Sequence, residues 1–235
     1  EETDATGGKY ITAVTSNHPL RGGKGGIHEG GIRVPAVVGW PDVAEAGSTS
    51  EVQIQANDLY PTLLKMSGIE QKIEHAIDGV DFTQALRGET MEREPLFTYV
   101  PSYGNTPQWL PPSMAVHQGD WKLIRTFHHG EDGAHEYRLY NLKDDIGESN
   151  NLAADHPDRV TKMDQLIKDY IAEAEVVEPV ANPSFDPAKF DATQIGVQAG
   201  GLKMPKGKPP PAEIKPLTAR QSTGNFYIDM LPIGR

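Results

Sequence analysis

The 235-residue sequence contains no cysteine, which excludes disulfide bonds, cysteine-ligated zinc and thiol catalysis. It also lacks long apolar runs, because no stretch approaches the roughly 18 to 20 apolar residues of a membrane span. The first residues, Glu1 to Asp4, have neither the basic nor the apolar region of a signal peptide. Positive charge is scarce, and the net charge of −11 argues against nucleic acid as a partner.

Glycine, by contrast, is concentrated in one stretch. Residues 20–35 read Leu-Arg-Gly-Gly-Lys-Gly-Gly-Ile-His-Glu-Gly-Gly-Ile-Arg-Val-Pro. The glycines let the backbone approach a ligand closely, and backbone N–H groups together with the ammonium of Lys24 can bind a tetrahedral oxyanion. The spacing is that of neither a Walker loop nor a dinucleotide-binding loop. On this local chemistry, an anion-binding loop and a structural glycine-rich turn both remain open.

Residues 19–35, with the pattern PLRGGKG followed by EGGIRVP, resemble the lysine-containing signature of the formylglycine-dependent, arylsulfatase-like sulfatases. The resemblance implies that Lys24 is catalytic and contacts the sulfate ester of a sulfated carbohydrate or aryl sulfate. It makes Arg21 and His28 candidate substrate-binding residues. It gives Glu29 and Arg33 structural positions in the signature.

The resemblance also shows what the sequence does not contain. The family forms its nucleophile in a Cys/Ser-x-Pro-x-Arg sequence, which is absent here. We therefore interpret the chain as the C-terminal part of a sulfatase whose nucleophile-bearing N-terminal half is absent or on another chain. Residues 3–8 stand where relatives carry a calcium-binding Ser-Asp-Asn-Gly-Gly, which leaves Asp4 as the candidate ligand for Ca²⁺. The family further implies a periplasmic or secreted location.

Two other functions are compatible with the sequence. A sulfatase-derived module without catalysis could bind sulfated glycans or a partner protein, and the missing nucleophile and altered calcium motif favour it. The presence of Lys24 among the glycines argues against it. A phosphatase or phosphodiesterase of the same superfold fits less well, because the loop signature belongs to the sulfatases.

The predicted fold class is α/β, namely the C-terminal part of an alkaline-phosphatase-like sulfatase sheet plus a small antiparallel sheet covered by one helix. We expect three regions: 1–112 completes the catalytic domain, 113–175 forms the small subdomain, and 176–235 is an extended tail rich in Pro, Gly and Lys.

Within this scheme, apolar runs and alternation predict strands, and the small sheet has one covered face. The strands are expected at residues 34–40, 95–100, 113–117, 121–126 and 137–142. A helix should begin after a cap at Asn57 and Asp58 and end at Gly68, and a second should run from Pro157 to Ala174 with Asp155 as its cap.

Three further features are weaker signals. The loop from Pro101 to Pro112 and its neighbours carry aromatic residues that could stack on a sugar or pack in the core: Tyr99, Tyr103 and Trp109. A hairpin holds the histidines of a possible transition-metal site, which are His128, His129 and His135. Residues 143–152 resemble a family segment and are interpreted as a turn between strand and helix.

Overall fold

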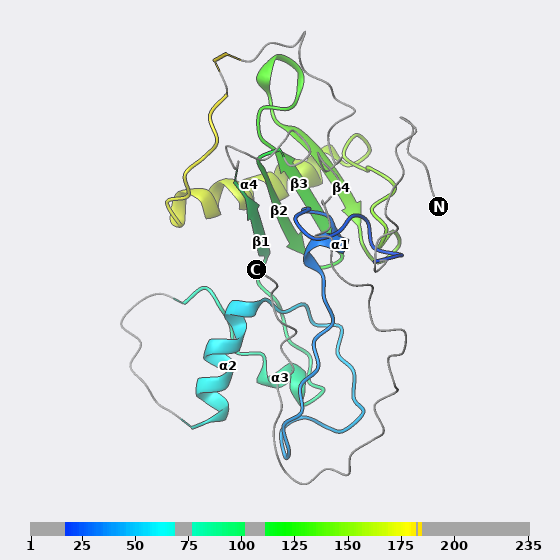
Figure 1. Ribbon diagram of the computed structural model, residues 1–235, viewed down its shortest axis with the longest axis vertical. Coiled ribbons are helices and arrows are strands. Elements are labelled where there is room, and N and C mark those ends of the chain that lie inside the picture. Colours follow the sequence, from blue (N-terminus) through cyan, green and yellow to red (C-terminus); the bar gives the residue numbers. More distant parts are fainter. Residues whose placement is uncertain (1–16, 69–76, 102–110, 182, 185–235) are drawn as a thin grey trace, which may run out of the picture. The chain divides into compact units, whose positions relative to one another are not determined.

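A computed structural model describes residues 17–68, 77–101, 111–181 and 183–184. The chain divides into two units, residues 1–201 and 202–235, and every described residue lies in the first (Figure 1). Asp4, Tyr103, Trp109 and most of the predicted tail lie outside the described residues.

The centre of the described region is a four-stranded antiparallel sheet in the order β1-β2-β3-β4. Its strands are β1 (Leu96–Val100), β2 (Ser113–Gln118), β3 (Trp121–Thr126) and β4 (Glu136–Asn141). All four were predicted within about one residue at their ends. Because β1 pairs directly with β2, the small sheet also includes residues 96–100, which precede the expected subdomain. The domain boundary at residue 112 stays a prediction.

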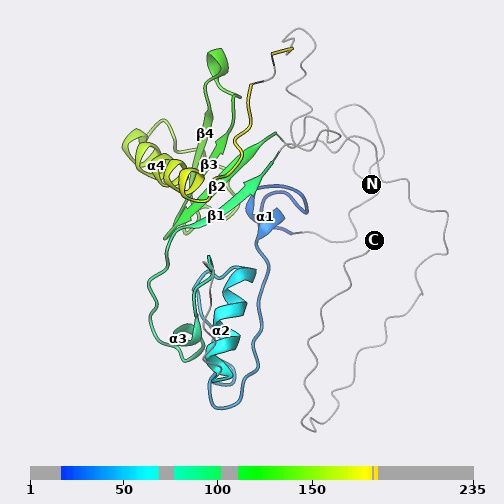
Figure 2. The ribbon, with the colours of Figure 1, turned by 90° about the vertical axis from the view of Figure 1, so that its left-hand side faces the viewer.

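One face of the sheet is covered by α4 (Pro157–Glu173), as Figure 2 shows. The helix presents an apolar stripe, and Met163, Ile167 and Ile171 pack with Met114 and Leu123 of the strands. The predicted stripe is thus confirmed as a core face. The predicted cap at Asp155 is wrong, because Pro157 occupies the first helical position and places the N-cap at the residue immediately before it.

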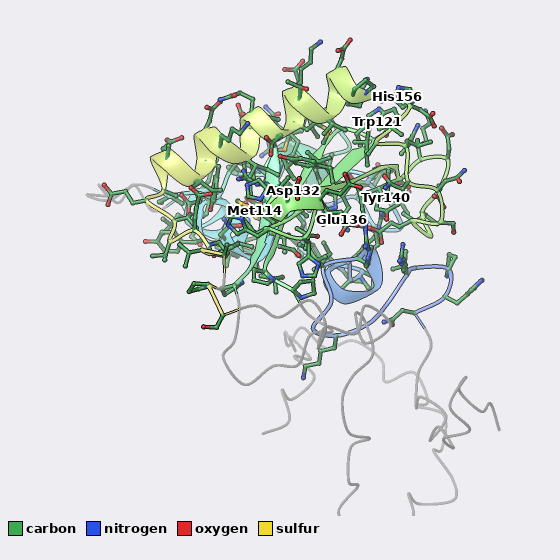
Figure 3. The ribbon with its side chains drawn as sticks, turned by 90° about the horizontal axis from the view of Figure 1, so that it is seen from above. Met114, Trp121, Asp132, Glu136, Tyr140 and His156 are labelled. Atoms are coloured by element: carbon green, nitrogen blue, oxygen red, sulfur yellow. The ribbon has the colours of Figure 1, made fainter. Side chains whose placement is uncertain are left out.

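The opposite face of the sheet is covered as well, which corrects the expectation of one covered face. The glycine-rich loop and its single-turn helix α1 (Glu29–Ile32) lie on this side (Figure 3). Ile27 of the loop packs in a second apolar cluster with Ala115, Ile124 and Tyr140. The central strands β2 and β3 are therefore buried on both sides, and the loop packs against the sheet.

The predicted strand at residues 34–40 does not form. Val34 and Val37 are 79% and 97% exposed, so the apolar run does not enter a core among the described residues. A strand needs a neighbour to pair its backbone N–H and C=O groups. No described strand pairs with this segment.

A helical segment precedes the sheet along the chain. The 3₁₀ turn η1 (Ala56–Asp58) leads into α2 (Leu59–Met66), and α3 (Thr83–Leu86) follows further on. The helix α2 ends before Gly68 at φ +64°, as predicted. Asp58 is the N-cap residue of α2, as predicted, but its side chain makes no cap bond to that helix and instead accepts the Gln55 N–H at 2.6 Å at the start of η1. Its buried carboxylate also accepts bonds from Val80 N–H at 2.9 Å and from Arg93 Nη2 at 2.9 Å.

Candidate active site

The glycine-rich loop borders a pocket of about 550 Å³ that is open to solvent. The exposed residue Lys24 lines it together with Asn17, Gly22, Gly23, Gly30, Gly31, Arg33 and Val34. The loop closes on itself through a hydrogen bond from Gly30 N–H to Arg21 O at 2.8 Å. Asn17 Nδ2 adds a bond of 2.9 Å to Gly30 O. The sequence folds locally into a pocket walled by glycine backbone, with Lys24 among its lining residues.

Two of the loop glycines are required by close backbone approach. A Cβ atom on Gly30 would lie 2.6 Å from Arg21 O, and one on Gly31 would overlap the carbonyl oxygen of Gly26. No side chain fits there without movement of the backbone. The Gly-Gly pair after Glu29 is therefore part of the pocket wall.

Glu29, directly before this pair, is buried, with only 2% of its surface exposed. Its Oε1 lies 2.9 Å from Lys122 Nζ and 2.8 Å from His117 Nε2. Burial alone would raise the pKa of Glu29, but the His117 hydrogen bond and the Lys122 charge outweigh it and lower the pKa to about 2. Glu29 is thus a fixed carboxylate, and the structural position implied for it agrees with these contacts.

Lys122 of β3 is fully buried and contacts the loop from the side of the sheet. Its ammonium lies 2.9 Å from each of three acceptors, namely Ile27 O, Glu29 Oε1 and Glu148 Oε1. The contacts to Ile27 O and Glu29 Oε1 are hydrogen bonds, and the contact to Glu148 Oε1 is an ion pair. Glu148 also accepts the Glu29 backbone N–H at 2.7 Å. The loop is therefore anchored through two carboxylates and one ammonium.

Glu148 lies in the segment 143–152, which forms the predicted turn after β4. Its backbone oxygen accepts a bond of 2.8 Å from Arg21 Nη1. Its Oε1 lies 3.1 Å from His28 Nδ1. This arrangement could not be predicted from the sequence, because Glu29, Lys122 and Glu148 are far apart in the chain and form no local motif.

The predicted site residues separate into two groups. Lys24 lines the pocket, whereas Arg21 and His28 point to Glu148 and are not among the lining residues. A role in substrate binding for Arg21 and His28 stays a prediction. Tyr99, considered for sugar stacking, donates its hydroxyl to Val177 O at 2.8 Å and packs edge-on against Phe127 in the core.

The sequence predicts a calcium ligand at Asp4 and a possible transition-metal site at the hairpin histidines. Within residues 17–68, 77–101, 111–181 and 183–184, no three His, Cys, Asp or Glu side chains gather as a metal site. His128 and His135 do lie together, with ring centroids 5.0 Å apart. Within these ranges the three hairpin histidines therefore form no such cluster, and the candidate calcium ligand Asp4 lies outside them. Nor does this part of the chain contain a helix long and apolar enough to cross a membrane.

Comparison with known proteins agrees with this architecture. A sulfatase of Formosa agariphila is 34% identical over 156 residues, which cover 63% of this chain and 27% of that protein. The human steryl-sulfatase is 33% identical over 114 residues, which cover 44% of this chain and 20% of that protein. The chain thus spans about a quarter of the length of these relatives.

Structural comparison gives the same result. The crystal structure of Ps i-CgsB in complex with k-i-k-neocarrahexaose matches with a TM-score of 0.56 and 25% identity, over 66% of this chain and 32% of that one. The sheet, its covering helix and the lysine loop define the C-terminal part of an alkaline-phosphatase-like sulfatase. The chain belongs to the family described as N-sulphoglucosamine sulphohydrolase, C-terminal, whose model matches residues 23–176.

Proposed function

We propose that this chain supplies the lysine-bearing part of a sulfatase, an enzyme that hydrolyses sulfate esters, and that the substrate is a sulfated carbohydrate. The observation that carries the proposal is the pocket in which Lys24 stands against a wall of glycine backbone. Membership of the sulfatase family supports it.

The chemistry assigned to this chain is the binding and stabilisation of negative charge. The ammonium of Lys24 contacts the oxygens of the sulfate group and stabilises the charge that builds on them when the ester bond breaks. The small volume of Gly23 and Gly30 lets these oxygens approach the backbone. The buried anchor at Lys122 keeps the loop in place while this charge develops.

The remaining parts of the proposal rest on the family. The nucleophile is assigned to an N-terminal half that is not part of these 235 residues. Calcium is proposed as the cofactor, bound mainly by that half, with Asp4 as the candidate ligand from this chain. A periplasmic or secreted location is proposed on the same basis. A non-catalytic module that binds sulfated glycans is the competing function.

Intact-mass spectrometry of the protein isolated from its source, under denaturing conditions, tests the proposal. We expect these residues to occur together with a polypeptide in which a cysteine or serine has the mass change of formylglycine. A single species with the mass of these 235 residues would contradict the proposed hydrolase and favour the non-catalytic module.

A further inference from the structure

Two cationic side chains line the pocket, Lys24 and Arg33. The family resemblance gives Arg33 a structural position, and one contact of that kind is present, from Arg33 Nη1 to Glu29 Oε2. At 3.5 Å this contact is longer than the 2.7 to 2.9 Å of a strong charge-assisted hydrogen bond. Arg33 is also 42% exposed, whereas Glu29 is 3% exposed at its side chain.

A guanidinium presents five N–H donors in a planar fork, and two of them can bind one oxyanion at the same time. The contact to Glu29 engages Arg33 through Nη1 alone. Part of the fork of a half-exposed, pocket-lining arginine is therefore directed to the solvent that a ligand would replace. Within the described part of the chain, Arg33 therefore has unoccupied N–H donors and a position at the pocket, as an anion-binding residue requires.

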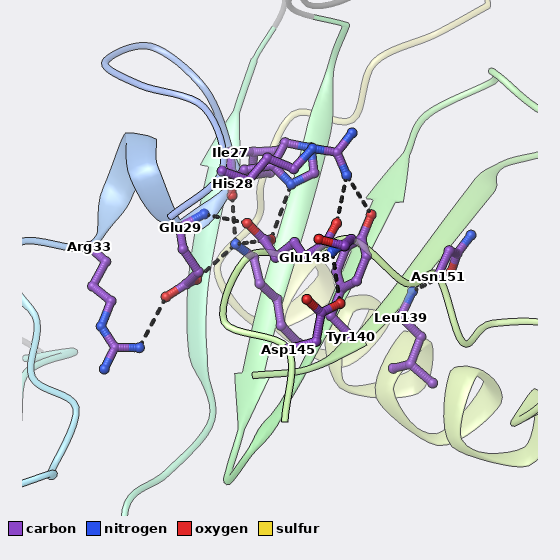
Figure 4. Close-up of polar contacts among 12 residues, drawn as sticks. Ile27, His28, Glu29, Arg33, Leu139, Tyr140, Asp145, Glu148 and Asn151 are labelled. Carbon is purple, nitrogen blue, oxygen red and sulfur yellow. Dashed lines mark hydrogen bonds and ion pairs between the residues drawn. The ribbon is translucent and has the colours of Figure 1, made fainter. Parts of the chain in front are cut away.

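Glu29, the carboxylate that contacts Arg33, is itself held by buried contacts, which Figure 4 shows in part. Glu29 Oε1 is occupied by Lys122 and His117, at 2.9 and 2.8 Å, so its Oε2 faces Arg33 in a fixed direction. The i to i+4 spacing across α1 brings the two side chains to the same face. Glu29 thus contacts the sheet through His117 and Lys122 and the pocket through Arg33.

We propose that Arg33 is a second anion-binding residue of the Lys24 pocket, and that Glu29 is the positioning residue that orients it. The inference extends the proposed function, because it assigns to the same pocket a ligand held by two cations. Such a pocket favours dianionic inorganic sulfate, or a sugar with a second anionic group beside its sulfate ester, over a neutral ligand.

The test is calorimetric titration of the protein in its native assembly with inorganic sulfate. We expect Arg33→Ala to raise the Kd on the order of tenfold or more, as for the loss of a charge-assisted contact. The exposed Arg87, outside the pocket, provides the matched control, and Arg87→Ala should leave the Kd unchanged. Equal Kd values for wild type and Arg33→Ala would overturn the inference.

A double-mutant cycle separates positioning by Glu29 from a general structural role. We expect Glu29→Gln to weaken sulfate binding more in the wild-type background than in the Arg33→Ala background. A general loosening of the loop alone would weaken binding by the same factor in both backgrounds and would overturn the positioning role. Circular dichroism confirms that each variant is folded at the titration temperature.

The sulfate titration is independent of the proposed hydrolysis. If Arg33→Ala weakens sulfate binding but no formylglycine is found by mass spectrometry, the hydrolase proposal fails and the two-cation pocket stands. If formylglycine is present and Arg33→Ala binds sulfate like wild type, the hydrolase proposal stands and the role of Arg33 is overturned.

Discussion

The ammonium of Lys122 lies 2.9 Å from the carboxylate of Glu148, and both side chains are completely buried. The pair joins β3 to the turn after β4, and Lys122 also binds Ile27 O and Glu29 in the glycine-rich loop. A buried ion pair adds little net stability compared with apolar packing, but the removal of one partner leaves an unpaired buried charge. The position of the loop therefore depends on Lys122.

Replacement of the buried lysine should strongly destabilise the protein. Lys122→Met keeps much of the side-chain volume but leaves Glu29 and Glu148 without their ammonium. We expect the free energy of unfolding to fall by about 3 to 5 kcal/mol, measured by urea denaturation. Lys65→Met is the matched control, because Lys65 is 65% exposed and pairs with Asp81 at the surface. The control should cost less than about 1 kcal/mol. Equal losses for the two variants would show that Lys122 is not an anchor.

Acid should weaken the anchor in a defined range of pH. The pKa of Glu29 is about 2 in the folded protein, below its ordinary value of 4.5, so the unfolded chain binds more protons between these values. The stabilisation is present above about pH 4.5 and is lost as the pH falls toward 2. Glu29→Gln has no carboxylate to titrate at this position. We expect its stability deficit, measured by urea denaturation at several pH values, to narrow steadily over that range.

Other carboxylates titrate in wild type and variant alike. The pKa values of Glu148 and Asp81 are also lowered, against the effect of burial, by their hydrogen bonds and neighbouring lysines. The comparison between wild type and Glu29→Gln measures the contribution of Glu29 together with its coupling to Glu148 through their shared partner Lys122. A stability deficit that is constant from pH 5 to pH 2 would contradict the assigned pKa.

The pocket wall should not accept a methyl group at Gly31. The added Cβ would overlap Gly26 O, so the loop must move, and we expect Gly31→Ala to lower the free energy of unfolding by about 1 to 3 kcal/mol. Gly39 is the matched control, since a Cβ there meets nothing within 4 Å. Gly39→Ala should change stability by less than about 1 kcal/mol. The free energies of unfolding of both variants are measured by thermal and urea denaturation. A Gly31→Ala variant as stable as wild type would contradict the close approach of Gly31 to Gly26 O.

The sheet and α4 were predictable from the sequence because their signals are local. Met163, Ile167 and Ile171 recur at helical spacing, and the hairpin at Gly119 gives the register of β2 and β3 directly. The lysine loop was predictable because its glycines and Lys24 form a contiguous signature. In each case the residues that determine the structure are close to one another in the sequence.

The rest depended on contacts between distant segments. The run from Val34 to Trp40 has the composition of a buried strand, but composition does not supply the neighbouring strand that it needs. Lys122 reads as a polar residue of a half-buried strand, and nothing near it indicates Glu29 or Glu148 as partners. Arg33 has a place in the signature, but only the structure shows it at the pocket.

The central claim is that Lys24 supplies positive charge for sulfate ester hydrolysis, and the most direct test is turnover of 4-methylumbelliferyl sulfate by the native assembly. We expect Lys24→Ala to lower kcat/KM on the order of a hundredfold or more, as for the loss of one group that stabilises an oxyanion. Lys65→Ala, at an exposed lysine outside the pocket, should retain wild-type turnover. Wild-type turnover by Lys24→Ala would contradict the account.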